Sequence, residues 1–499
     1  MLLYKWLAEA TRTRGSAKAL VYKDTYYSWR GLQHRVERRV QEFGAMGIGK
    51  GHWVGLMLGN VPDFAILTLA LSKMGATVVP LDPTTGTRDL SLILDHAPLR
   101  ALITRPRGGL DQNAATSPDA PPPPVVPAST KKGTDPVESR RRLQGTLLTC
   151  SIYKAPKEPP GKAAAVLFTN DAAGEPKGVL RTEENLEAAA ANAAGALEAT
   201  PDDRILTTVP LFHAYGFDLG LLLALRFGST LYLEDEVAPA RIVKLLREQE
   251  IDLLPGTPGL YGGLAKLPTA KPLKIKKARY LSSGSALPDS TAEAFRERWG
   301  IRIVPVYHTT EASMVACDRT GKTPDSVGKP IDGLEVRIGD SPDPKAATPA
   351  GQAGPLWVRG KSCSKGWVGA NAKRTNGARA KGAPVAIGET DDKGWLRIGD
   401  LGSFDKSGRL FLAGREDHLV KVDGKRVALA EVEGCLEQFP KVHGAKVRVI
   451  TDPLGGPIMV ASVVVAGKCA PEELIDHCAK NLAPYKVPRR IEFCETLPA

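Results

Sequence analysis

The sequence lacks the features that mark disulfide-rich, zinc-binding or membrane-spanning proteins. Its seven cysteines are widely spaced and include no C-x-x-C pair, so neither a disulfide framework nor a zinc site is indicated. The amino terminus has no apolar core of the kind found in signal peptides. The longest apolar run, residues 64–81, is interrupted by Lys73, Gly75 and Pro80, which argues against a transmembrane helix. We therefore expect reduced thiols, a cytoplasmic location and no membrane span.

Long blocks of one charge are also missing, although the chain as a whole is basic. Its formal net charge is +12 over 499 residues, a length that allows more than one domain. Basic residues gather only locally, at 271–279 and 373–381, and no recognition helix or zinc finger accompanies them. The positive charge suits small polyanionic substrates as well as weak binding to nucleic acid or acidic membrane, so its sign alone decides little. We expect no nucleic-acid partner because these motifs are missing.

From about residue 160, strand-like runs alternate with helix-like segments. The clearest helix lies at 238–249, where Ile242, Val243, Leu245 and Leu246 recur at helical spacing. The predicted strands are 204–209, 230–233, 251–254, 278–282 and 301–306, and a second helix spans 290–299. Residues 1–104 show the same rhythm, with helices near 29–46 and 63–74 around a strand at 52–58. Such alternation predicts an α/β fold with mostly parallel sheets and flanking helices.

Two changes of pattern indicate the domain organisation. Residues 106–160 contain the run Pro121–Pro124 and the basic triplet Arg140–Arg142, and their composition cannot bury a core. We predict a flexible insertion there, with a proline-rich ligand motif as the alternative. After Gly414 the pattern becomes helix–strand–strand–helix–strand, which predicts a small α+β domain. The predicted organisation is a large domain at 1–414, a hinge at 415–417 and a small domain at 418–499.

Residues 168–179 read FTNDAAGEPKGV and follow the strand-like run 163–167. A loop that wraps a triphosphate needs inward N–H groups, small residues and hydrogen-bond donors, and Thr169, Gly174 and Lys177 fit those roles. Asp171 instead places a carboxylate where phosphate would lie. One unit of like charge at ~4 Å costs about 4 kcal/mol near a protein surface unless a cation intervenes. Taken alone, the segment fits either a phosphate-binding loop or an ordinary surface loop.

This segment resembles the phosphate-binding loop of the adenylate-forming superfamily, and the chain resembles the AMP-dependent acyl-CoA synthetase/ligase family within it. Further matching stretches follow the family's order at 47–54, 75–76, 80–83, 210–216, 283–286, 307–311, 394–402 and 414–417. The resemblance implies a large amino-terminal domain of mostly parallel sheets with flanking helices, and a small carboxyl-terminal α+β domain.

The resemblance also implies roles for the residues of the motif Tyr-His-Thr-Thr-Glu. Tyr307 would stack on adenine, Thr310 would bind the α-phosphate, and Glu311 would hold Mg²⁺, a hard cation that prefers oxygen ligands. His308 stands where the family commonly has glycine, which reshapes the floor of the pocket. Backbone groups of the loop 283–285 would meet the purine edge.

Other implied roles concern the acyl group, the ribose and a domain rotation. His213 would gate access of the acid and the thiol, Asp400 would accept the ribose hydroxyls, and Arg415 would contact ribose or phosphate. Asp417 would be the hinge, and Gly424 would line the pantetheine tunnel. The residues expected to be catalytic are Lys177, His213, Thr310, Glu311 and Arg415. Those expected to bind ATP or CoA are Thr169, Gly174, Lys177, Ser283, Gly284, Ser285, Tyr307, His308, Thr309, Thr310, Asp400, Arg415 and Gly424.

Together the motifs predict an AMP-forming carboxylic acid–CoA ligase that uses ATP, Mg²⁺ and CoA. The apolar stretch after His213 favours a fatty or aryl acid, and we expect a monomer or homodimer. Two alternatives stay open: a ligase that loads an acyl carrier protein, and a catalytically impaired homologue that binds nucleotide or acyl ligand. The second alternative rests on Asp171 and on the sequence ending at Ala499, before the family's last motif and its catalytic lysine.

Overall fold

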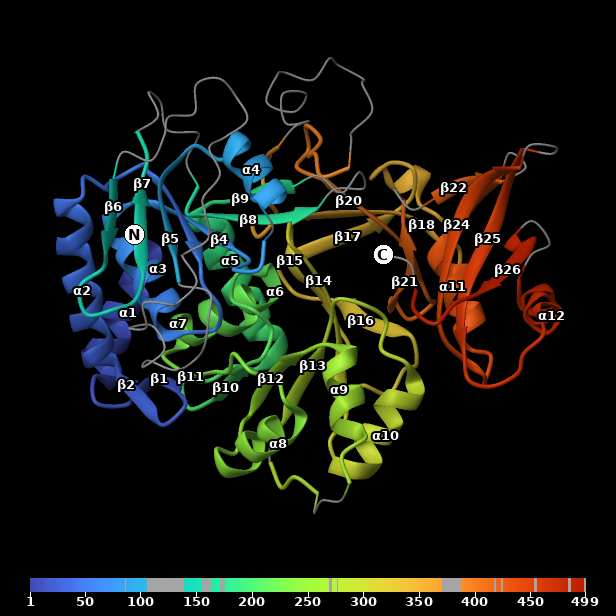
Figure 1. Ribbon diagram of the computed structural model, residues 1–499, viewed down its shortest axis with the longest axis horizontal. Helices are drawn as coiled ribbons and strands as arrows, with labels where there is room; N and C mark the ends of the chain where they lie inside the picture. The colour runs from blue at the N-terminus through green and yellow to red at the C-terminus, as the bar shows by residue number, and fades with distance from the viewer. Residues whose placement is uncertain are drawn as a thin grey trace. The chain divides into compact units, whose positions relative to one another are not determined.

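The computed structural model describes residues 1–85, 87–105, 139–154, 163–170, 176–268, 272–275, 277–369, 387–416, 419–422, 425–452, 456–482 and 486–497 (Figure 1). Its internal contacts divide the chain into a first unit, residues 1–336 and 358–397, and a second unit, residues 337–357 and 398–499. The predicted boundary at 414 falls inside the second unit, because β20 (Leu396–Phe404) pairs with β21 (Leu410–Arg415). The described residues contain no helix long and apolar enough to cross a membrane.

One sheet of the first unit has the strand order β16-β15-β14-β13-β12-β10-β11-β1-β2. These strands are β1 (Lys18–Tyr22), β2 (Thr25–Ser28), β10 (Arg204–Thr207), β11 (Thr230–Leu233), β12 (Leu253–Gly256), β13 (Arg279–Ser282), β14 (Ile303–Thr309), β15 (Ser313–Cys317) and β16 (Ser326–Pro330). All pairs from β1 to β14 along this order are parallel, and the pairs β1–β2, β14–β15 and β15–β16 are antiparallel. The predicted α/β class with a mostly parallel sheet is confirmed.

Three helices lie beside β12 and β13 in Figure 1: α8 (Pro239–Glu248), α9 (Pro258–Ala265) and α10 (Asp289–Trp299). The predicted apolar stripe of α8 is confirmed, since Ile242, Val243 and Leu246 are buried in one core with Phe295 and Trp299. Burying each such aliphatic side chain contributes about 1.5–3 kcal/mol relative to leaving it in water. This core packs the helices against the parallel strands and so holds the carboxyl ends of the strands in place.

The second sheet of this unit has the order β19-β9-β8-β4-β3-β5-β7-β6. Its strands are β3 (Trp53–Met57), β4 (Thr77–Leu81), β5 (Leu99–Thr104), β6 (Ser139–Arg142), β7 (Thr149–Ile152), β8 (Ala165–Asn170), β9 (Pro176–Arg181) and β19 (Trp367–Val368). Further helices of the unit are α1 (Leu2–Arg14), α2 (Trp29–Ala45), α3 (Pro62–Met74), α4 (Thr87–His96), α5 (Glu183–Leu197), α6 (Ala214–Gly216), the π-helix η2 (Phe217–Leu222) and α7 (Leu223–Phe227).

Two predictions, one for the insertion 106–160 and one for the strand 163–167, need correction. Part of the predicted insertion 106–160 forms β6 and β7, because Cys150 and Ile152 are buried and the basic triplet Arg140–Arg142 forms a charged edge strand. Residues 106–138 and 155–160 of that insertion lie outside the described residues. The strand predicted at 163–167 continues to 170, because β8 and β9 pair as an antiparallel hairpin.

The second unit contains its own core and a three-stranded sheet. Besides β20 and β21 it has η3 (Pro344–Ala346), β22 (Leu419–Val422), β23 (Lys425–Ala428), α11 (Leu429–Glu437), β24 (Val442–Asp452), β25 (Gly456–Val465), α12 (Pro471–Asn481) and β26 (Arg490–Phe493). The chain passes between the units within β17 (Leu334–Ile338), β18 (Gly354–Gly360) and β20. Helix α11 packs against β24, and α12 packs against α11 and β26, so that Val432, Leu436 and Leu474 are buried in one core with residues of β24 and β25. The short paired strands β22 and β23 precede α11. The pattern predicted for the small domain began with a helix and did not include these two strands.

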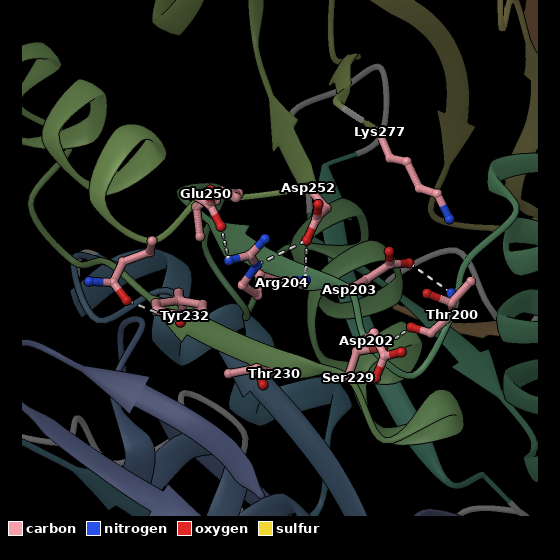
Figure 2. Close-up of polar contacts among 12 residues, drawn as sticks. Thr200, Asp202, Asp203, Arg204, Ser229, Thr230, Tyr232, Glu250, Asp252 and Lys277 are labelled. Atoms are coloured by element: carbon pink, nitrogen blue, oxygen red, sulfur yellow. Dashed lines mark hydrogen bonds and ion pairs between the residues drawn. The ribbon is translucent and has the colours of Figure 1, made fainter. Parts of the chain in front are cut away.

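Polar side chains at the amino ends of β10, β11 and β12 form a network (Figure 2). Arg204 donates from its backbone N and from Nε to Asp252 Oδ2, at 3.0 and 3.2 Å. Asp203 accepts from the backbone N of Thr200 at 2.7 Å and from Arg279 Nη2 at 2.6 Å. Because ligands of parallel α/β sheets bind at the carboxyl ends of the strands, we assign this network to stability.

The adjacent residues Asp202 and Asp203 allow a matched test of that assignment. Replacing Asp203 by Ala leaves the mostly buried Arg279 without its carboxylate, so the free energy of unfolding is expected to fall by about 1–3 kcal/mol. Replacing Asp202 by Ala removes an ion pair whose carboxylate is 90% exposed, and the loss is expected to stay below about 1 kcal/mol. Urea denaturation followed by circular dichroism measures both. Equal losses would contradict the assignment.

Candidate functional site

The predicted nucleotide-binding residues of the first unit follow two neighbouring parallel strands. The loop 283–285 comes directly after β13, and the motif of residues 307–311 spans the end of β14 and the turn into β15. Ser283 is buried and donates from its backbone N to the Gly256 carbonyl at 3.3 Å, whereas Gly284 and Ser285 are exposed. Gly284 has φ +96°, a conformation that favours glycine. The carboxyl edge of the sheet, where α/β folds bind ligands, therefore carries both segments.

An ion pair joins the predicted phosphate-binding lysine to the predicted metal-binding carboxylate. Lys177 Nζ lies 2.9 Å from Glu311 Oε1, and the two side chains are only 8% and 14% exposed. Lys177 sits on β9 directly opposite Thr169 of β8, so the hairpin places both predicted phosphate contacts on one face. The Glu311 carbonyl is also fixed, since it accepts from the backbone N of Ser364 at 2.7 Å.

Two residues that the sequence did not single out surround Lys177. Its Nζ lies 5.3 Å from the centroid of the Trp367 ring, within the range of a cation–π contact. A Cβ added at Gly388, where φ is +83°, would come within 2.3 Å of Lys177 Nζ. Gly388 follows a low-complexity stretch and Trp367 lies in a two-residue strand, so local pattern offered no signal for either.

The residues present at Glu311 fit a magnesium ion that is bound together with nucleotide. Within the described ranges, no group of three or more His, Cys, Asp or Glu side chains could hold a metal ion by itself. Mg²⁺ in phosphate-transfer sites is commonly held by one or two carboxylates together with substrate phosphates. A single carboxylate beside a lysine agrees with that arrangement, in which Glu311 would hold the ion and Lys177 the phosphate oxygens.

His213, the residue predicted to gate acid and thiol access, lies at the start of α6 and remains exposed. Its Nδ1 accepts from the backbone N of Tyr215 at 3.4 Å. Although the residue is exposed, neighbouring groups displace part of the water around its imidazole, and this loss of hydration together with the nearby His308 lowers the pKa of His213, while Asp218 opposes the shift. A lowered pKa favours the neutral imidazole at neutral pH, which suits a gate for apolar and thiol groups.

A buried charge cluster of Arg181, Asp218 and His308 lies next to these residues. Arg181 Nη1 is 3.4 Å from Asp218 Oδ2, and the side chains are 0% and 2% exposed. His308 Nε2 is 3.1 Å from the same oxygen, and the ring centroids of His308 and Tyr215 are 5.3 Å apart. Burial opposes ionisation of Asp218, but Arg181 and His308 outweigh it and lower the pKa of its carboxyl group.

Arg181 and Asp218 are functional candidates that the sequence analysis missed. The available signal was a charged residue inside an apolar run, as in GVLRT and FDLGLLL. His308 was expected to reshape the pocket floor as part of the nucleotide site, and its side chain points instead into this cluster.

Several predicted roles remain predictions. Tyr307 and Thr309 are buried, and the Thr309 hydroxyl accepts a hydrogen bond from the backbone N of Ala312 at 3.0 Å. Stacking of Tyr307 on adenine stays a prediction. In the second unit, Arg415 Nη1 donates to Asp400 Oδ1 at 3.3 Å across the β20–β21 pair. The predicted residues Asp171, Gly174, Asp417 and Gly424 lie outside the described residues.

Comparison with known proteins places these residues in a family. Residues 7–368 match the family model described as AMP-binding enzyme, and residues 431–499 match the one for the AMP-binding enzyme C-terminal domain. The chain is 28% identical to a sulfoacetate–CoA ligase of Cupriavidus necator over 477 residues, covering 92% of this chain and 87% of that protein. It is 27% identical to a feruloyl-CoA synthase of an Amycolatopsis species, covering 99% and 96%.

Solved structures resemble the whole chain. The O-succinylbenzoate coenzyme A synthetase of Bacillus subtilis in complex with AMP superposes with a TM-score of 0.79 at 22% identity, over 99% of this chain and 95% of that one. This similarity concerns the fold. With a family match that spans most of the first unit and a second that covers the end of the chain, the protein belongs to the AMP-binding enzyme family of adenylate-forming enzymes.

Proposed function

We propose that the protein is an AMP-forming carboxylic acid–CoA ligase. A carboxylate oxygen of the acid attacks the α-phosphorus of ATP to give acyl-AMP and pyrophosphate. The CoA thiol then attacks the acyl carbon, and AMP leaves. The observation that carries the proposal is the Lys177–Glu311 pair at the carboxyl edge of the parallel sheet, in a chain that belongs to the AMP-binding enzyme family.

The site supplies charge where the first step needs it. Adenylation displaces an anionic leaving group, so cations and fixed donors near the phosphates are the main source of rate enhancement. When bound, Mg²⁺ neutralises charge on the phosphate oxygens. In our proposal Lys177 binds the phosphates, Glu311 holds the ion, and Thr310 contacts the α-phosphate. Asp400 and Arg415 keep the ribose and phosphate contacts that the family resemblance implies for them.

We propose a fatty or aryl acid as the substrate. The segment after His213 supports an apolar acyl environment, since Phe217, Leu219 and Leu221 are buried. A feruloyl-CoA synthase among the relatives fits an aryl acid, whereas a sulfoacetate–CoA ligase at similar identity shows that family similarity alone leaves the acid open. The seven free cysteines support a reducing compartment such as the cytoplasm.

The direct test is ATP–pyrophosphate exchange that depends on an added carboxylic acid. The full chain is incubated with Mg²⁺, ATP and labelled pyrophosphate, together with aliphatic acids of increasing length, ferulate, other aryl acids and sulfoacetate. We expect exchange with at least one fatty or aryl acid, and a CoA thioester of that acid by mass spectrometry. No exchange with any acid would overturn the proposal.

The two alternatives have separate signatures. A carrier-protein ligase would form acyl-AMP but transfer the acyl group to a phosphopantetheinylated carrier protein in preference to CoA. An impaired homologue, which Asp171 favours, would bind ATP in calorimetry without exchange or turnover. Comparing CoA with carrier protein as acceptor, alongside calorimetry, distinguishes these outcomes from the ligase.

A further inference from the structure

We propose that Asp218 is a positioning residue for the nucleotide site. It holds Arg181 and His308, and these two residues fix the turn that presents Thr310 and Glu311. The inference rests on the proposed function, because it assigns the turn to binding of ATP with Mg²⁺. It concerns above all Asp218 and Arg181, to which neither the motifs nor the family resemblance gave a role in that site.

Three segments that are far apart in the sequence meet at the Asp218 carboxylate. Arg181 ends β9, the strand that also carries Lys177, and His308 belongs to β14. Asp218 lies in the π-helix η2, directly after the motif that contains His213. π-Helical turns are rare and are frequently found at functional sites. Asp218 therefore connects the β8–β9 hairpin, the motif of residues 210–216 and the strand β14.

The turn after β14 is held on both sides through this carboxylate. On one side, His308 is tied to Asp218 Oδ2 at 3.1 Å. On the other, Arg181 Nη1 donates to the Thr310 carbonyl at 3.1 Å while it faces the same Asp218 oxygen. Loss of the carboxylate would remove the group that holds both His308 and Arg181 in place, and Glu311 directly follows Thr310 in the chain.

The energetics favour a role other than stability. Arg181 Nε and Nη2 have no hydrogen-bond partner among the residues that the structure describes, and the Ser313 hydroxyl is a further hydrogen-bonding group beside the Asp218 carboxylate. Burying two charges with incomplete pairing costs free energy, and well-packed apolar residues of similar size often give equal or greater stability. The Arg181 side chain has 0% exposure, so a shift of its partner must be taken up by packed neighbours. Such a cluster is rigid, as positioning requires.

The test compares two conservative substitutions in buried Asp–Arg pairs. Asp218→Asn keeps the shape and removes the charge, and we expect it to weaken binding of ATP with Mg²⁺ by about 10- to 100-fold, the usual effect of losing a group that orients a metal ligand. Acid-dependent pyrophosphate exchange at fixed ATP should fall in parallel. Asp203→Asn alters the pair with Arg279 at the opposite ends of the strands, and it should lower stability while binding and exchange change less than about 3-fold.

A double variant and a binding measurement on the wild-type chain provide further tests. The double variant Arg181→Met with Asp218→Leu removes both charges without leaving one of them buried alone. We expect it to fold and to show the same loss of MgATP affinity, and wild-type affinity in this variant would overturn the inference. MgATP binding by calorimetry also separates the two proposals. A wild-type chain that binds MgATP without exchange refutes the ligase function, whereas equal MgATP affinity of wild type and Asp218→Asn refutes the role of Asp218.

Discussion

Replacing Lys177 by Met should lower the rate of acid-dependent pyrophosphate exchange by about 10²- to 10³-fold, the usual cost of losing one preorganised charge-stabilising group. Met keeps most of the side-chain volume against Trp367, so the packing change is small. The lost group is the cation that lies 2.9 Å from Glu311 and is expected to bind the phosphates. The exchange rate at saturating ATP and acid measures the effect.

Lys365 provides the matched control for this substitution. It lies close to Trp367 in sequence, is 75% exposed, and forms a 3.7 Å ion pair with Glu184. Lys365→Met should leave the exchange rate within about 2-fold of wild type, because exposed ion pairs contribute little. Equal effects of the two substitutions would mean that loss of general positive charge, and not the phosphate contact of Lys177, explains the result.

Replacing Glu311 by Gln should raise the Mg²⁺ concentration needed for half-maximal exchange by about 10- to 100-fold. An uncharged amide oxygen can still accept a hydrogen bond from Lys177, but it is a poorer ligand for a hard divalent cation than a carboxylate. Outer-shell losses alone commonly cost 10- to 100-fold in metal affinity, so removal of a direct ligand should reach at least that range. Exchange measured over a Mg²⁺ titration at fixed ATP gives the answer.

A structural role of Glu311 would produce a different result. The substitution leaves Lys177 without its counter-charge, so thermal stability is expected to change as well. If stability falls but the Mg²⁺ titration keeps its wild-type midpoint, Glu311 is a partner of Lys177 and not a metal ligand. Glu184→Gln, at an exposed position of α5, serves as the control and should alter neither quantity appreciably.

Much of the fold followed from local pattern. The helix predicted at 238–249 forms α8, and the strand predicted at 230–233 forms β11, because hydrophobic periodicity decides which face of a short segment can be buried. The sequence analysis predicted only part of β8, and it did not predict β9, β7 or the edge strand β6. Their formation depends on pairing partners elsewhere in the sheet, and a local window of sequence contains no information about those partners.

The sequence by itself determined the class of the fold, the order of the motifs and the chemical types available for a nucleotide site. The tertiary structure decided which of these residues meet. Lys177 and Glu311 are 134 positions apart, and Asp218 and His308 are 90 apart, so no periodicity relates them. Lys177 lies on β9 of the second sheet and Asp218 in the helix η2, and both elements meet β14 of the first sheet near its carboxyl end. A carboxylate inside an apolar run therefore acquired a proposed role only when the tertiary structure placed Arg181 of β9 and His308 of β14 against it.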